Sequence, residues 1–279
     1  MKYQSFNSSC CYAGLANMLD DFSIDVEDRD IALAANLPYM LRFDPERNSF
    51  LAGAMLQGAK WFNLFLKPRG LHFAERVMSR EAAVNFLASA DARVMLGVEV
   101  SEGIKSALVF DGIRGGRFHL INNKWKNSDG SERFMFTAQE LYDRLSDENL
   151  LGWVEPSTKS QIDFPEELSL TLSCIPKYRT ALHDFCSVSR DRITLNWAVE
   201  PLFRPLLTDI PSMMELVGEA RIYLMLCVLQ RSFDAAFSSD GDKITVFDFL
   251  SEQQLNETLD RYTEIVRDKI IKIQTASGN

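Results

Sequence analysis

Two adjacent cysteines near the N-terminus narrow the range of folds open to this chain, because they lie where a polar segment gives way to a helical pattern. Ser8 and Ser9, which are favourable helix N-cap residues, directly precede Cys10. The apolar residues that follow recur at helical spacing: Cys11, Leu15, Met18, Leu19 and Phe22. The pattern predicts a helix that begins near Cys10 and turns Cys11 toward the core.

Cys10 lies off this apolar stripe, in the first turn of the predicted helix. Unpaired backbone N–H groups and the helix dipole favour a thiolate at that position, and the thiolate is the nucleophilic form of cysteine. The same helix face continues through Gly14 and Asn17. Two interpretations are open: Cys10 is a nucleophile, or both cysteines are small buried hydrophobic residues, as most free cysteines are.

Gln4 favours the nucleophile, since a side-chain amide donor beside a helix-start cysteine is what an oxyanion hole requires. The spacing Gln4-x5-Cys10, followed by a helix, resembles the start of papain-like cysteine peptidases. The bacterial branch that includes the double-glycine leader peptidases is similar to the longer pattern Cys10-x2-Ala13-x-Leu15-Ala16-x-Met18-Leu19. Butirosin-type acyltransferases, which carry a helical domain after a papain-like one, are a further resemblance.

The middle of the chain predicts a sheet. Three segments rich in β-branched and aromatic residues, separated by Gly-containing turns, predict consecutive antiparallel strands at 94–100, 107–113 and 117–123. A short strand at 134–137, an amphipathic helix at 138–145 and a strand at 150–154 follow. The resemblance then implies an α+β, papain-like domain over residues 1–156, in which the first helix packs on an antiparallel sheet.

The last third of the chain predicts a second domain. A polar, proline-containing segment at 157–167 marks the boundary. Helical patterns at 178–193, 212–237 and 251–275 predict an all-α domain over residues 168–279. His183 and Cys186 are spaced as metal ligands on one of these helices, but no further ligand accompanies them, so we expect packing roles and neither a metal nor another cofactor.

A papain-like site needs a histidine to accept the nucleophile's proton and an asparagine or aspartate to orient that histidine. The resemblance implies that Asn123, covered by Trp125, is the orienting residue and that Ser106 occupies the histidine position. A serine hydroxyl cannot act as a general base near neutral pH. His119 and His72 are the alternative bases, although no motif supports His72.

The hairpin between the second and third predicted strands sets which residues face the same way. A two-residue turn at Gly115-Gly116 predicts that Leu108 pairs with Asn123. In that register Ser106, Asn123 and His119 share one sheet face, with His119 about 20 Å from the Ser106 position along the strands. His119 is therefore too far away to replace the missing base in this register.

We expect one cleft to be formed by Gln4, Cys10, Ser106 and Asn123. Without an imidazole partner, the Cys10 thiol is expected to stay largely protonated at neutral pH. Three functions are open: an enzyme that uses Cys10 to attack a peptide bond or a thioester, an inactive protein that binds a peptide or acyl partner, and an ordinary α+β domain with a coincidental Gln–Cys spacing. Thioester chemistry suits the first best, since a thiolate leaves with less proton donation than an amine.

The net charge of −9 argues against a nucleic-acid or anionic-membrane partner. If the butirosin-type resemblance holds, the acyl donor is an acidic carrier protein, which Lys67 and Arg69 are placed to receive. The five cysteines are scattered through helical patterns and predict no disulfide framework. We find neither a signal-peptide pattern nor a membrane-length apolar run, and expect a cytoplasmic protein.

Overall fold

The computed structural model describes residues 1–6, 8–124, 133–188, 193–195, 200–219, 244–246 and 252–277, so Trp125, Cys227 and most of the predicted helix at 212–237 lie outside the described residues. The chain divides into two compact units. The first comprises Met1–Ala35 and Gln57–Ile162, and the second comprises Asn36–Leu56 and Asp163–Asn279. The junction between Ile162 and Asp163 falls within the polar segment at 157–167, whereas residues 36–56 belong to the second unit.

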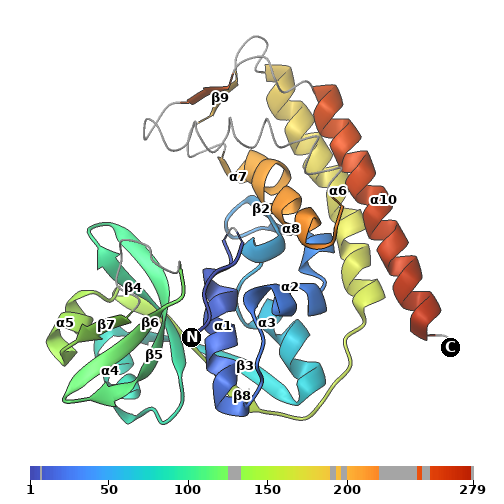
Figure 1. Ribbon diagram of the computed structural model, residues 1–279. Helices are drawn as coiled ribbons and strands as arrows, with labels where there is room; N and C mark the ends of the chain where they lie inside the picture. Colours follow the sequence, from blue (N-terminus) through green and yellow to red (C-terminus); the bar gives the residue numbers. More distant parts are fainter. Residues whose placement is uncertain are drawn as a thin grey trace. The chain divides into compact units, whose positions relative to one another are not determined.

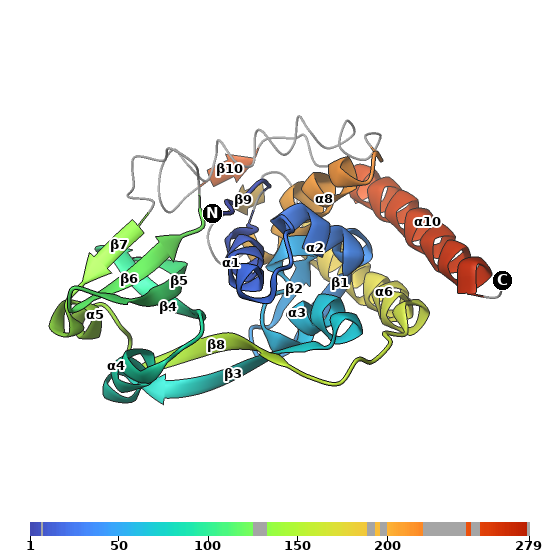
Figure 2. The same cartoon turned by 60° about the horizontal axis from the view of Figure 1, so that its bottom comes forward.

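A six-stranded antiparallel sheet forms the centre of the first unit, with strand order β3-β8-β4-β5-β6-β7 (Figure 1). Its strands are β3 Leu71–Ser79, β4 Val94–Ser101, β5 Ile104–Arg114, β6 Arg117–Asn122, β7 Arg133–Phe136 and β8 Glu148–Pro156. All five predicted strands are present, and β3, which runs alongside β8, is an additional one (Figure 2).

Five α-helices accompany this sheet in the described part of the first unit: α1 Cys10–Leu19, α2 Asp28–Ala34, α3 Ala59–Leu66, α4 Arg80–Ser89 and α5 Ala138–Asp143. Short 3₁₀ turns follow α1 at Asp20–Phe22 and α3 at Lys67–Arg69. The sequence sets the helix starts locally. Ser79 accepts a hydrogen bond from the Ala82 amide at the start of α4, and Thr137 and Glu140 form a capping box at the start of α5.

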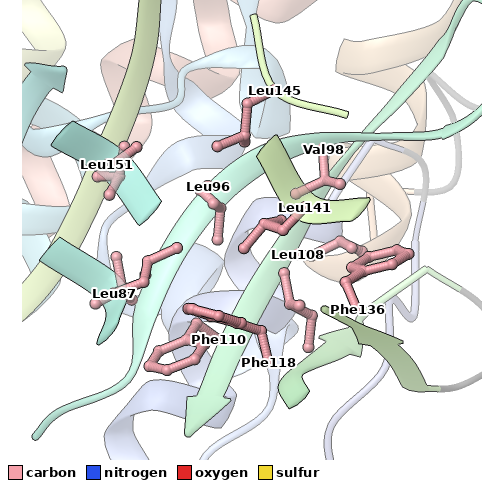
Figure 3. Close-up of a cluster of buried hydrophobic side chains, with 13 residues drawn as sticks. Leu87, Leu96, Val98, Leu108, Phe110, Phe118, Phe136, Leu141, Leu145 and Leu151 are labelled. Carbon is pink, nitrogen blue, oxygen red and sulfur yellow. The ribbon is translucent and has the colours of Figure 1, made fainter. Parts of the chain in front are cut away.

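The two faces of the sheet are covered differently. Large apolar side chains fill one face, together with α4 and α5 (Figure 3): Ala83, Leu87, Val94, Leu96, Val98, Leu108, Phe110, Phe118, Leu120, Phe136, Leu141, Leu145 and Leu151. Helix α1 packs on the other face at Gly14, where a Cβ atom would lie 2.8 Å from the Met95 Cε atom and 3.3 Å from the Val109 Cγ2 atom. The helix approaches the sheet this closely because Gly14 has no side chain.

Two long helices, α6 Phe164–Val188 and α10 Glu252–Ser277, lie side by side in the second unit (Figure 1). The unit also contains α7 Glu200–Arg204, α8 Ile210–Leu216, a π-helical turn at Pro205–Asp209, 3₁₀ turns at Leu37–Tyr39 and Gly53–Met55, a hairpin of β1 Leu41–Asp44 and β2 Ser49–Ala52, and the paired strands β9 Ile193–Leu195 and β10 Ile244–Val246. The predicted apolar stripe of α10 is buried at Leu255, Leu259, Tyr262, Ile265 and Val266.

The β1–β2 hairpin explains why residues 36–56 belong to the second unit. Phe50 packs on Tyr178 of α6 with ring centroids 4.6 Å apart, and the Arg42 guanidinium donates to the Thr171 hydroxyl at 2.7 Å. Arg42 also forms a salt bridge with Glu167. The predicted α+β class, a helix packed on an antiparallel sheet followed by a helical region, is confirmed. No helix among the described residues is long and apolar enough to cross a membrane.

Candidate active site

Helix α1 begins at Cys10, as predicted, and the Cys10 side chain is half-buried. Ser9 is the N-cap residue, but its hydroxyl does not cap the helix. It donates instead to the Phe6 carbonyl and to the Asp28 carboxylate. The N–H groups of the first turn are therefore left without a side-chain acceptor from the N-cap, and they can interact with the Cys10 sulfur.

The surroundings of Cys10 favour its thiolate. A hydrogen bond with the Cys11 side chain, backbone N–H groups of Cys11 and Cys10, and the positive charge of Lys124 together lower the pKa of the Cys10 thiol to about 7, against the opposing effect of burial. A thiol with this pKa is roughly half ionised at neutral pH. The expectation that Cys10 stays largely protonated therefore needs correction, because a helix start, a thiol donor and a lysine replace part of what an imidazolium would supply.

Cys11 is half-buried, like Cys10. Its thiol donates to the Gln57 Oε1 atom at 3.2 Å. The Gln57 Nε2 atom in turn donates to the Ser8 carbonyl at 3.2 Å. The hydrogen bond with Cys10, together with burial, raises the pKa of Cys11 well above its usual value, so Cys10 is the cysteine of the pair that ionises first.

The N-terminal segment is held on both sides as it approaches α1. The Lys2 amide donates to the Asn17 Oδ1 atom at 2.7 Å, and the Gln4 amide donates to the Asn123 carbonyl at 2.7 Å. The Ser5 amide donates at 2.7 Å to Asp28, a fully buried carboxylate of α2. Gln4 is buried and fixed next to Asn123, which brings two of the predicted site residues together.

Asn123 is fully buried beneath α1. Its Oδ1 atom accepts a hydrogen bond from Asn17 Nδ2 at 2.8 Å, and its Nδ2 atom donates to the Ala107 carbonyl at 3.4 Å. A Cβ atom at Gly14, one turn after Cys10, would lie 3.0 Å from Asn123 Nδ2. The side-chain amide of Asn123 therefore anchors α1 to the sheet with both of its polar atoms.

Ser106 does not join this group. Near the turn the predicted register is correct, since Arg114 pairs with Arg117, but it shifts by one residue between Phe110 and Ile113. Beyond the shift, Leu108 pairs with Asn122 rather than with Asn123. Ser106 pairs with Val98 and lies two residues before Leu108 on β5, so its side chain shares their sheet face. Val98 and Leu108 belong to the filled core, and Ser106 therefore lies on the face opposite α1.

Ala107 takes the position that the prediction gave to Ser106. It lies two residues before Val109, which faces α1, and so it shares that face. Its carbonyl accepts a hydrogen bond from the Asn123 side-chain amide. Neither the alanine nor the serine side chain can serve as a general base. On the α1 face, the residue of β5 beside Asn123 is therefore Ala107 and not Ser106.

Neither of the two histidines of the first unit lies next to Asn123. His119 is opposite the register shift in β6, four residues before Asn123, or about 13 Å of strand. His72 of β3 pairs with Glu155 of β8. Like Ala74, two residues later, it lies on the face opposite α1. His183 belongs to the second unit, where its Nδ1 atom lies 2.7 Å from Glu252, and this carboxylate raises the pKa of the imidazole.

Other predicted sites have simple structural roles. Lys67 and Arg69 lie in the 3₁₀ turn at the C-terminal end of α3, where the Arg69 guanidinium stacks on the Phe65 ring and donates to its carbonyl. Cys186 on α6 is half-buried. Among the described residues, no cluster of three or more histidine, cysteine or acidic side chains could hold a metal ion.

Sequence reasoning missed four residues of the site: Asp28, Gln57, Ala107 and Lys124. Asp28 is the first residue of α2. An acidic residue at a helix start was the available signal. The other three contribute through backbone or long-range contacts, which no local pattern reveals.

The fold and the site together define a class of protein: an α+β protein in which a helix packed on an antiparallel sheet begins at a cysteine of lowered pKa and is anchored by a buried asparagine. Among solved structures, the chain is similar to the peptidase domain of Streptococcus ComA, a bifunctional ABC transporter involved in a quorum-sensing pathway. The match has 11% identity and a TM-score of 0.38, and it covers 56% of this chain and 97% of that domain. No protein-family model and no curated protein matches the chain.

Proposed function

We propose that this chain is a papain-like cysteine protein that uses Cys10 to take an acyl group from a thioester. The observation that carries the proposal is the placement of Cys10 at the start of α1, where its thiol has a pKa of about 7. Neither histidine of the first unit lies beside Asn123, so we assign the activation of Cys10 to the helix start, Cys11 and Lys124.

The absence of a neighbouring imidazole supports a thioester over a peptide bond as the substrate. The Cys10 thiolate attacks the thioester carbonyl, a new C–S bond to Cys10 forms, and the original C–S bond breaks. The leaving group departs as a thiolate, which takes a proton from solvent. A peptide bond would release an amine, and this requires a positioned proton donor that the site lacks.

Gln4 and Asn123 have distinct roles in this proposal. The Gln4 side chain supplies a hydrogen-bond donor to the oxyanion, since its main chain is fixed beside the site by the Asn123 carbonyl. Asn123 is a positioning residue, because its amide is already bonded to Asn17 and Ala107. An acyl-transfer function would also agree with the resemblance to butirosin-type acyltransferases, in which a helical domain follows the papain-like one.

Mass spectrometry tests the proposal directly. The full chain is incubated with the acetyl thioester of N-acetylcysteamine, and acetylated peptides are mapped. We expect one acetyl group on Cys10, its loss in Cys10→Ser, and its retention in the matched control Cys174→Ser, which changes a half-buried cysteine of the second unit. Faster cleavage of a peptide amide than of the thioester would show a peptidase and contradict the proposed substrate.

A second candidate is an inactive binding protein with a papain-like fold. The specific observation in its favour is that both polar atoms of the Asn123 amide are occupied, so the residue that would orient a catalytic histidine serves as a structural anchor. In this case no acetyl group would appear on Cys10 under conditions in which iodoacetamide still alkylates it. The same experiment therefore separates the two candidates.

A further inference from the structure

One row of residues crosses the α1 face of the sheet immediately beyond the helix. Val77 of β3 pairs with Leu150 of β8, and Gly97 of β4 pairs with Ala107 of β5. The β8–β4 register, in which Gly152 pairs with Met95, continues the row from Leu150 to Gly97. We call Val77, Leu150, Gly97 and Ala107 the apolar strip.

The apolar strip ends at the candidate active site. The Ala107 carbonyl accepts the Asn123 amide, and Asn123 is covered by α1 one turn after Cys10. The next row toward the centre of the sheet contains Met95, on which α1 packs. The strip is thus the first row of this face that the helix leaves open, and it leads from the nucleophile across four strands.

The residues of the strip are unusually apolar for an open sheet face. Val77 is 58% exposed and Leu150 is 52% exposed, although they are direct cross-strand neighbours. Gly97 is exposed, and a Cβ atom there would have no neighbour within 4 Å. An antiparallel sheet normally presents polar residues on a face exposed to solvent, so contiguous apolar residues indicate a surface that is covered in use.

We infer that the apolar strip binds the aliphatic chain of the acyl group that Cys10 accepts. This inference rests on the proposed function and adds the chemical class of the acyl donor. The strip spans three inter-strand steps, or about 14 Å, which suits a linear chain of medium length.

The hydrogen bonding of the sheet favours an aliphatic chain over a peptide. Every residue of the strip lies within a paired strand, and none has a polar side chain. A peptide lying across such a face finds few partners for its own N–H and C=O groups, whereas an aliphatic chain has no polar groups to satisfy. The neighbouring row, which contains Glu148, Glu99 and Lys105, carries charges of both signs and is polar, in contrast to the strip.

Acylation rates measured over a series of chain lengths test the inference. The full chain is treated with acetyl, hexanoyl and decanoyl thioesters of N-acetylcysteamine below their micelle concentrations, and acylation of Cys10 is followed by mass. We expect a rate increase of roughly twofold per methylene, since a chain on an open face buries about half of its surface. Over the eight methylenes that separate decanoyl from acetyl, the decanoyl-to-acetyl ratio should therefore reach roughly two hundredfold.

Substitutions in the strip should remove this ratio. Val77→Asp and Leu150→Asp are each expected to lower the decanoyl-to-acetyl ratio at least fivefold, because each places a charge on the apolar strip. Ile104→Asp is the matched control, because Ile104 is 53% exposed on β5 and lies outside the strip, and it should keep the wild-type ratio. Unfolding midpoints and iodoacetamide alkylation of Cys10 establish that each variant is folded with an accessible thiol.

The outcomes separate this inference from the function on which it rests. Acylation of Cys10 at equal rates by all chain lengths overturns the role of the strip and leaves the thioester function intact. Faster acylation by an apolar tripeptide thioester than by the decanoyl thioester also overturns it, in favour of a peptide ligand. If no thioester acylates Cys10, the proposed function itself fails, and the strip loses its assigned ligand with it.

Discussion

On β4, Leu96 points into the filled core while the adjacent Gly97 is exposed on the α1 face. The same alternation occurs on β8, where Leu151 is buried and Leu150 is 52% exposed. On β5, Leu108 points into the core. The adjacent Ala107 faces the other way, and its carbonyl accepts a hydrogen bond from Asn123. The same strands therefore bury large apolar residues on one face. On the other face they carry the open apolar strip, which ends at the polar anchor Asn123.

The difference between the two faces separates stability from function. The filled face supplies buried apolar area, which is the main favourable term in folding. The α1 face is packed where Gly14 lets α1 approach and where Phe62 of α3 meets Phe73 of β3, and it is open at the apolar strip. Substitutions on the two faces should therefore differ in whether they change the free energy of unfolding or the reactivity of Cys10.

The largest expected effect is on the filled face. Leu96→Ala should lower the free energy of unfolding by about 2–5 kcal/mol, because it removes a fully buried side chain and leaves a cavity. The adjacent Gly97→Val is the control. Since a Cβ atom at Gly97 has open space and a β-branched residue suits a strand, it should keep the stability or raise it by about 0.5–1 kcal/mol. Denaturant unfolding measures both, and equal losses would contradict the comparison.

The anchor on the α1 face should have a smaller effect on stability. Asn123→Ala removes one of the three acceptors of the Asn17 amide and the side-chain donor to the Ala107 carbonyl, at a cost of about 0.5–1.5 kcal/mol in the free energy of unfolding for each hydrogen bond. A double-mutant cycle with Asn17→Ala measures the pairwise term, which we expect to be at least about 0.5 kcal/mol. Additive losses would mean that the two side chains do not act together.

The register shift marks the limit of what could be predicted about this site. The Gly115-Gly116 turn and the pairs next to it follow from the sequence, because a two-residue loop fixes the register of a hairpin. Farther along, Asp111 and Gly112 lie opposite His119 alone, and Gly112 has a φ of +103°. One extra residue on one strand changes which face every later residue takes, and hairpin arithmetic cannot detect it.

The helix start was predictable, and its surroundings were not. Cys10 was located correctly from N-cap residues and helical spacing, since both are local properties of the chain. Lys124 lowers the pKa of Cys10 from the end of β6, and Gln57 binds Cys11 from a position just before α3. Such contacts depend on tertiary structure. The packing of the β1–β2 hairpin on α6 also depends on contacts that no local pattern reveals.

A histidine introduced on either face of β5 distinguishes the two registers. Ala107→His places an imidazole on the α1 face beside Asn123, so the pH profile of Cys10 alkylation should shift toward acid by about one unit or more. Ser106→His places it on the opposite face and should leave the profile unchanged. Iodoacetamide rates from pH 5 to 9 measure both, and an acid shift in Ser106→His alone would restore the register predicted from the turn.

The smallest expected effect concerns the charge of Lys124. In the wild-type protein, the alkylation rate of Cys10 should rise with pH through an inflection near 7, because the thiolate reacts and the pKa of the thiol is lowered to about 7. Lys124→Gln removes a positive charge that favours the thiolate, so the inflection should move to higher pH by about a few tenths of a unit, and less at high salt because the lysine is exposed.

Lys159→Gln, which changes an exposed lysine of the same unit, is the matched control and should leave the inflection in place. A shift of equal size in both variants would assign the effect to net charge rather than to the position of Lys124. An inflection near 9 in the wild-type protein would mean that the first turn of α1 does not stabilise the thiolate at all.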